Sequence, residues 1–285
     1  MTWSAHERRL LEPLAAFDQL HGATMRRFGG RVIDLSYPNP RVSVDGRPGQ
    51  TLAVIAAKAG VEDLRYSPFG GFATVRRTVA ASLSRRHALP YTFRDVILTP
   101  GAAAAINVVL RALFRPGGRV GVICPCWMDY PLYAASAGLC CDLIPTGPGK
   151  RLDLAQVERA WTAETIGLVI SQPASPTGVL YTADELTGLA ATLRRMGQRH
   201  GQAPILLSDE AHRDQVWSGA PFTSPARFYP QTVSVYSFGK AWEMQGQRVG
   251  YAAVSPRWPR RESVRLRRCT GNRRGRRGAA GEGLR

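Results

Sequence analysis

Long apolar runs are missing from this chain of 285 residues. No uninterrupted apolar stretch approaches the length needed to cross a bilayer, and residues 1–7 lack the apolar core of a secretory signal peptide. The 44% hydrophobic and 21% charged residues are typical of globular proteins. We therefore expect a cytoplasmic protein with no membrane partner and enough residues to bury a full core.

Cysteine is scarce, and its spacing argues against the common cysteine-based sites. The five cysteines include the motif Cys124-Pro-Cys126 and the adjacent pair Cys140 and Cys141, and neither has the spacing of a zinc site. Without a secretory signal, a disulfide framework is not expected either. We expect free thiols that pack as small hydrophobic groups, and no metal site.

Acidic residues are outnumbered by basic ones, mainly at one end of the chain. The formal net charge is +17, and residues 257–285 hold eleven arginines and two glutamates, which leaves +8 for residues 1–256. Residues 256–285 are also rich in glycine without apolar periodicity, so they are predicted to form a disordered basic tail. Such tails attract phosphate backbones, but no aromatic residue follows Trp258 and no helix-turn-helix is seen, so nucleic acid is not the expected partner.

Strand and helix patterns alternate through residues 51–255, which we interpret as the main domain. The alternation, repeated at least five times, predicts a three-layer α/β fold with a mostly parallel, doubly wound sheet. In such sheets ligands bind at the carboxyl ends of the strands. The patterns predict strands at 95–100, 117–124, 141–144, 166–171, 204–208 and 232–236. They predict a turn at 101–105 and helices at 106–114, 130–138, 153–160 and 182–200.

Residues 1–50 lie outside this alternation. Apolar residues at helical spacing predict one or two helices over 4–28, and a short strand is predicted at 32–36. We expect this segment to belong to a smaller domain or to reach a partner subunit. Further helices are predicted at 52–58 and 74–87.

Lys240 follows the predicted strand at 232–236, with Ser237 three residues before it and Arg248 eight residues after it. Lysine can act as a nucleophile that forms a Schiff base, while a hydroxyl and an arginine can hold a phosphate. The alternative interpretation is a surface loop with two ordinary basic residues.

Three other strand ends carry groups that can bind a ligand. Gly101 begins a small-residue turn before a helix, which is a typical anion site. Trp127 can stack on a planar ring, or can simply pack in the core. Asp209 can pair with a protonated ring nitrogen within reach of His212, or can cap the turn that follows it.

In this order, the motifs resemble the fold-type I, pyridoxal-phosphate-dependent aminotransferases of class I/II, over about residues 33–251. The resemblance implies that Lys240 forms the Schiff base with the cofactor and transfers a proton, and that Asp209 pairs with the pyridine nitrogen. It implies an enzyme that acts on an amino acid and a 2-oxo acid as a homodimer. The other implied cofactor contacts are Gly101, Ala102, Ala103, Ser237 and Arg248 at the phosphate, Trp127 at the ring, and Tyr66 at the phosphate of the neighbouring subunit.

The chain departs from the family pattern at the ring 3′-oxygen. Ser175 stands where the family has an asparagine, and His212 stands where it has a tyrosine. We expect both residues to contact the cofactor with altered geometry. Gly239, before the lysine, replaces a serine.

A larger departure follows residue 255. Members of the family continue into a small domain whose arginine binds the substrate carboxylate, and nothing identifiable replaces it here. We expect a truncation or a change of reading frame near residue 260 that impairs turnover. A lyase, decarboxylase or synthase of the same fold, or an inactive remnant with a polyanion-binding tail, are the alternatives.

Overall fold

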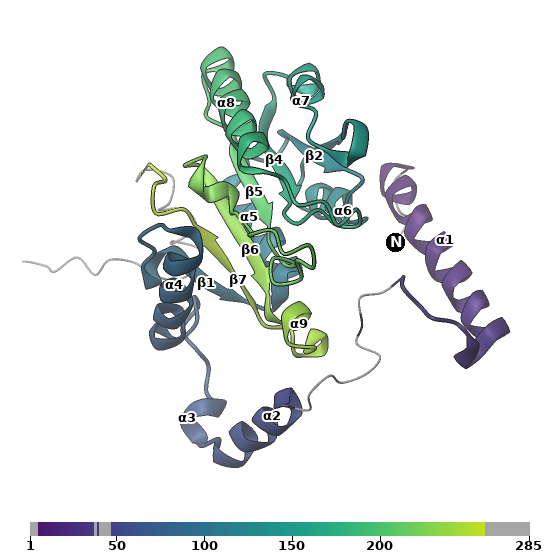
Figure 1. Cartoon of the computed structure of the whole chain (residues 1–285), viewed down its shortest axis with the longest axis vertical. Coiled ribbons are helices and arrows are strands. Elements are labelled where there is room, and N and C mark those ends of the chain that lie inside the picture. The colour runs from purple at the N-terminus through teal and green to yellow at the C-terminus, as the bar shows by residue number, and fades with distance from the viewer. Residues whose placement is uncertain (1–4, 37–38, 40–46, 260–285) are drawn as a thin grey trace, which may run out of the picture.

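The computed structural model describes residues 5–36, 39 and 47–259, so most of the basic tail lies outside the described residues. In this part of the chain, seven strands form one sheet in the order β1-β7-β6-β5-β4-β2-β3 (Figure 1). Only β7 runs antiparallel to its neighbours, β1 and β6. The strands are β1 (Val96–Thr99), β2 (Arg119–Cys124), β3 (Cys140–Pro145), β4 (Thr165–Ser171), β5 (Ile205–Asp209), β6 (Thr232–Ser237) and β7 (Gly250–Val254).

Helices cover both faces of the sheet, which confirms the predicted three-layer, doubly wound fold. Strand alternation divides the core between the faces: Val169 and Leu207 pack in the cluster that includes α5, whereas Leu168 and Leu206 pack in the cluster that includes α8. The helices are α1 (Ala5–Phe28), α2 (Arg47–Lys58), α3 (Val61–Leu64), α4 (Ala73–His87), α5 (Gly101–Leu113), α6 (Tyr130–Ser136), α7 (Leu154–Ala160), α8 (Ala183–His200) and α9 (Phe238–Ala241).

The start of α8 follows from a capping box in the sequence. The hydroxyl of Thr182 accepts a hydrogen bond from the Glu185 N–H at 3.2 Å, and the Glu185 carboxylate accepts one from the Thr182 N–H at 2.8 Å. Two backbone donors of the first turn are therefore satisfied by side chains. The helix ends at His200, and the C-cap residue Gly201 has a φ of 69°, which is favourable for glycine.

The N-terminal segment differs from the prediction. Residues 32–36 do not form the predicted strand; instead Asp34 accepts hydrogen bonds from the Ser36 N–H at 2.9 Å and from His21 at 3.1 Å. Short polar side chains that bond to nearby backbone compete with strand pairing. None of the described side chains in α1, α2 or α3 is buried. Figure 1 shows α1 to the right of the sheet and α2 and α3 below it.

Among the described residues, no helix combines the length and the apolar character needed to span a membrane. The strand β7, which the sequence patterns did not predict, inserts between β1 and β6 and brings its first residue to the carboxyl edge of the sheet.

Candidate active site

The carboxyl ends of the central strands meet at one edge of the sheet. In the strand register Ser171 of β4 lies opposite Asp209 of β5, and Ser237 of β6 lies opposite Gly250 of β7. Because β7 is antiparallel, its first residue lies at this edge beside the last residue of β1, Thr99. Residues predicted from separate parts of the sequence are thus collected along a single edge.

Two glycines allow the N-terminus of α5 to approach this edge. A Cβ on Gly250 would lie 2.4 Å from the Tyr236 carbonyl oxygen and 2.8 Å from the Gly101 Cα. Gly101 itself has a φ of +80°, and a Cβ on it would lie 2.7 Å from a guanidinium nitrogen of Arg248. The absence of both side chains therefore lets the arginine rest directly on the first turn of α5.

This arrangement forms an anion site. The first turn of the 13-residue helix α5, which contains Ala102 and Ala103, carries backbone N–H groups and the positive end of the helix dipole. The Arg248 guanidinium lies against it and is held by a bond from Nη1 to the Gln245 carbonyl oxygen at 2.9 Å. Arg248 adopts a left-handed conformation, with a φ of 48°, at the C-cap of the turn that precedes β7.

Lys240 lies on α9, directly after β6, and is half-buried. Burial lowers the pKa of its ammonium group, and the nearby Arg248 charge lowers it further, while Asp209 acts in the opposite direction. The three charged groups are therefore close enough to influence one another. A lysine with a lowered pKa is a better nucleophile at neutral pH.

Asp209 is held by two hydrogen bonds. Its Oδ2 accepts one from the Tyr130 hydroxyl at 2.7 Å, and its Oδ1 accepts one from the Ala211 N–H at 3.0 Å. Burial raises the pKa of Asp209, and these two bonds partly offset that rise. The Ala211 bond is the turn cap that the sequence offered as an alternative, so the carboxylate caps its turn and also faces the site.

Tyr130 was not among the predicted site residues. It begins α6, three residues after Trp127, and its side chain is buried. Its position in the sequence could have indicated this role. A tyrosine at the start of a helix that follows a strand can place its hydroxyl near the end of a neighbouring strand.

The Tyr130 hydroxyl donates to Asp209 and so stabilises its charged carboxylate. We expect Tyr130→Phe to remove this stabilisation and to raise the pKa of Asp209 further. A hydrogen bond to a charged group contributes about 1.5–3 kcal/mol. Carboxyl ¹³C NMR titration of the whole chain measures this change. Tyr133→Phe is the matched control, because its hydroxyl bonds to Asp129 instead, at 2.9 Å. An unchanged Asp209 titration in Tyr130→Phe would contradict the assigned role.

A second network lies next to Asp209. The Glu210 side chain is fully buried, and its Oε1 accepts hydrogen bonds from Ser224 at 2.6 Å and Ser234 at 2.7 Å. Its Oε2 lies 3.1 Å from Nε2 of the buried His87 and 3.7 Å from Nη1 of Arg213. The network joins α4, β6 and two loops to the residue that follows Asp209.

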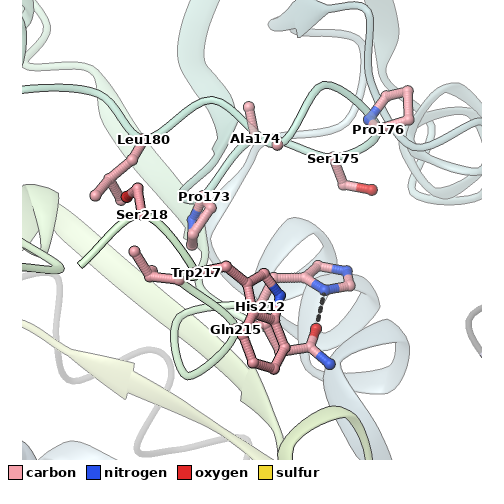
Figure 2. Close-up of a pocket in the computed structure, with 11 residues that line it drawn as sticks. Pro173, Ala174, Ser175, Pro176, Leu180, His212, Gln215, Trp217 and Ser218 are labelled. Atoms are coloured by element: carbon pink, nitrogen blue, oxygen red, sulfur yellow. Dashed lines mark hydrogen bonds between the residues drawn. The ribbon is translucent and has the colours of Figure 1, made fainter. Parts of the chain in front are cut away.

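A cavity of about 380 Å³ separates two loops that follow β4 and β5 (Figure 2). Ser175 lies on one loop and His212 on the other, so the two residues predicted to contact the same ligand atom line one space. Gln215 and the exposed Trp217 line it too. Gln215 was not predicted; its side chain bonds both to His212 and to the Lys240 carbonyl oxygen.

Comparison with known proteins accounts for this arrangement. The family model for aminotransferase class I and II matches residues 39–270, past the point near residue 260 where the sequence was expected to leave the family pattern. The chain belongs to the class I and II aminotransferases. It spans about half the length of several curated relatives that it matches in sequence.

Individual relatives agree with this assignment. This aminotransferase chain is 35% identical over 191 residues to a probable aspartate/prephenate aminotransferase of Thermus aquaticus, covering 66% of the chain and 48% of the relative. It is 31% identical to the valine–pyruvate aminotransferase of Mycobacterium tuberculosis over 82% of the chain and 59% of that protein. An aspartate aminotransferase structure from Thermus thermophilus matches with a TM-score of 0.76 and 26% identity, covering 95% of the chain and 65% of that structure.

Class I and II aminotransferases use pyridoxal 5′-phosphate, and the residues of this chain fit that group. The first turn of α5, together with Arg248 and Ser237, is suited to the phosphate. The Arg248 guanidinium can lie against this turn because it occupies the space that a Cβ on residue 101 would fill. Asp209 is suited to a protonated ring nitrogen and Lys240 to the aldehyde. One edge of the sheet therefore offers a partner to the phosphate, the ring nitrogen and the aldehyde of the cofactor.

The contacts of two predicted aminotransferase site residues with the cofactor stay predictions. Trp127 is half-buried and packs against the cluster that includes α5 and α6, which leaves its predicted contact with the ring untested. Tyr66 is fully exposed, and its own chain does not bring it to the site. Its predicted contact with a neighbouring subunit stays a prediction. In the described residues the four cysteines are free thiols, and no cluster of His, Cys, Asp or Glu is arranged to hold a metal ion.

Proposed function

We propose that this chain acts as a pyridoxal-phosphate-dependent aminotransferase on an amino acid and a 2-oxo acid. The observation that carries the proposal is the meeting of Lys240, Asp209 and Arg248 at the edge where α5 begins. The amine, the acid and the anion site come from three separate strand ends. The alternative interpretation of Lys240 and Arg248 as ordinary residues of a surface loop does not explain why these groups meet. Membership of the family and the names of its relatives support the reaction type.

Each residue has a defined task in this proposal. Ser237, Arg248 and the α5 N–H groups anchor the phosphate and so fix the position of the ring. When bound, the cofactor supplies an electron-accepting ring that stabilises the charge left at the amino acid Cα. Asp209 holds the proton on the ring nitrogen, and Lys240 moves a proton at Cα, aided by the lowered pKa of its amine.

We further propose a homodimer in the cytoplasm. Large apolar side chains are exposed along the N-terminal helices and the loop that follows them, and such surfaces usually mark an interface. The four free cysteines support a reducing compartment. The exposed residues are Leu20, Ile33, Leu35, Val54, Ile55, Val61, Leu64, Tyr66 and Phe69.

A half-reaction tests the proposed chemistry. The purified chain is loaded with pyridoxal phosphate and mixed with aspartate, valine or phenylalanine in turn. Transamination converts the cofactor to pyridoxamine phosphate and releases one 2-oxo acid per cofactor, both measured by chromatography. Release of carbon dioxide or of an elimination product instead would assign a different reaction, and a chain that loads no cofactor would refute the proposal altogether.

A further inference from the structure

The side chain of Gln215 joins the ring of His212 to the backbone of Lys240. Its Nε2 donates to the Lys240 carbonyl oxygen at 3.1 Å. Its Oε1 lies 2.7 Å from the His212 Nδ1, a contact that Figure 2 shows as a dashed line. A carbonyl oxygen can only accept, so the amide must turn its NH₂ group toward Lys240 and its oxygen toward His212. The imidazole nitrogen that faces an acceptor must then carry the proton.

We propose that Gln215 fixes His212 in the Nδ1–H tautomer, so that the neutral ring presents a bare Nε2 acceptor to the cavity and selects ligands that donate a hydrogen bond. Gln215 is thus a positioning residue that acts through His212. This inference goes beyond the proposed function, because it concerns the chain without cofactor.

The cavity lining supports this ligand class. His212 is the only titratable side chain among the residues that line the cavity, and no lining side chain carries a permanent charge. Trp217, Leu180 and two prolines provide apolar walls, and the hydroxyls of Ser175 and Ser218 provide small polar contacts. The expected ligand is therefore a small, neutral, partly apolar molecule with a hydroxyl or amine.

Long-range ¹H–¹⁵N NMR of the whole chain, labelled with ¹⁵N at its five histidines, measures the tautomer directly. His212→Asn assigns the signals by removing one set. At a pH where titration of these signals shows the ring to be neutral, we expect the protonated-type resonance on Nδ1 and the bare-type resonance on Nε2. The opposite pattern in the wild-type chain would overturn the inference.

Two variants separate positioning from general structure. Gln215→Leu removes the acceptor, so we expect the ring to move toward the Nε2–H form that free histidine prefers. Gln215→Glu keeps an acceptor but loses the donor to Lys240, so we expect it to retain the Nδ1–H form. If Gln215→Leu keeps the wild-type tautomer, or if Gln215→Glu loses it, then Gln215 does not set the proton position.

Phenol and benzoate test the ligand class, because they have nearly the same size and differ in donor and charge. With increasing phenol we expect the Nε2 resonance of His212 to shift in a saturable manner, while benzoate leaves it unchanged at equal concentration. An equal response to both, or no response to phenol, would overturn the selectivity. Neither probe involves pyridoxal phosphate, so failure here is distinct from failure of the proposed reaction.

Discussion

Lys240→Ala abolishes the covalent capture of pyridoxal phosphate by this chain. After incubation with the cofactor and reduction with borohydride, the wild-type chain gains one pyridoxyl group, whereas the variant stays at background. The reason is chemical: burial and the Arg248 charge lower the pKa of the Lys240 amine, so a larger share of it is neutral and able to attack the aldehyde. Mass spectrometry of the whole protein and of its peptides measures the outcome.

The other lysines of the chain provide the control for this experiment. The chain contains only three lysines, and both others, Lys58 and Lys150, are exposed. A variant with both exposed lysines changed to alanine retains full capture, with the label on the peptide that contains Lys240. Label spread evenly over all three lysines, or capture that persists in Lys240→Ala, would show that Lys240 is an ordinary surface amine.

Glu210→Ala lowers the free energy of unfolding by about 3–5 kcal/mol, because it leaves His87, Arg213 and the serine hydroxyls buried without their common acceptor. Urea unfolding at neutral pH measures the loss. Glu158→Ala is the matched control, since the Glu158 pair with Arg195 is partly exposed and contributes less than about 1 kcal/mol. Equal losses in the two variants would contradict the buried network.

Glu210 also makes the free energy of unfolding depend on pH in the acid range. Burial alone would raise the pKa of Glu210, but His87, Arg213 and the Ser224 hydroxyl outweigh it and lower the pKa to about 2. A lowered pKa contributes stability above the unfolded value of 4.5, and that contribution is lost as the pH falls toward 2. The shift corresponds to about 3 kcal/mol. Glu210→Gln should remove this part of the acid dependence, and an unchanged pH profile in that variant would refute it.

The sequence predicted the parts of the structure that depend on local patterns. Strand periodicity and the Thr182 capping box indicated the α/β sheet and the start of α8 correctly. The strand-end positions of Gly101, Asp209 and Lys240 follow from that alternation, because parallel strands present their carboxyl ends at one edge. Local chemistry was therefore sufficient for the frame of the site.

What the sequence missed depends on contacts between distant residues. Tyr130 reaches Asp209 across 79 positions, and Gln215 reaches Lys240 across 25, so neither bond leaves a local pattern. Residues 32–36 looked like a strand because of their apolar alternation, yet the described residues offer them no strand partner, and Asp34 bonds locally instead. The strand β7 is rich in glycine and alanine, and only its place between two neighbours makes it a strand.

The late position of β7 in the chain has a consequence for synthesis. β1 pairs with no strand of the described sheet except β7, and Arg248 immediately precedes that strand. At typical ribosomal rates the interval between the emergence of β1 and that of β7 is on the order of ten to thirty seconds. During that time β1 has no strand to pair with, and the anion site lacks its arginine. The nascent chain therefore completes its anion site only when almost the whole described domain has left the ribosome.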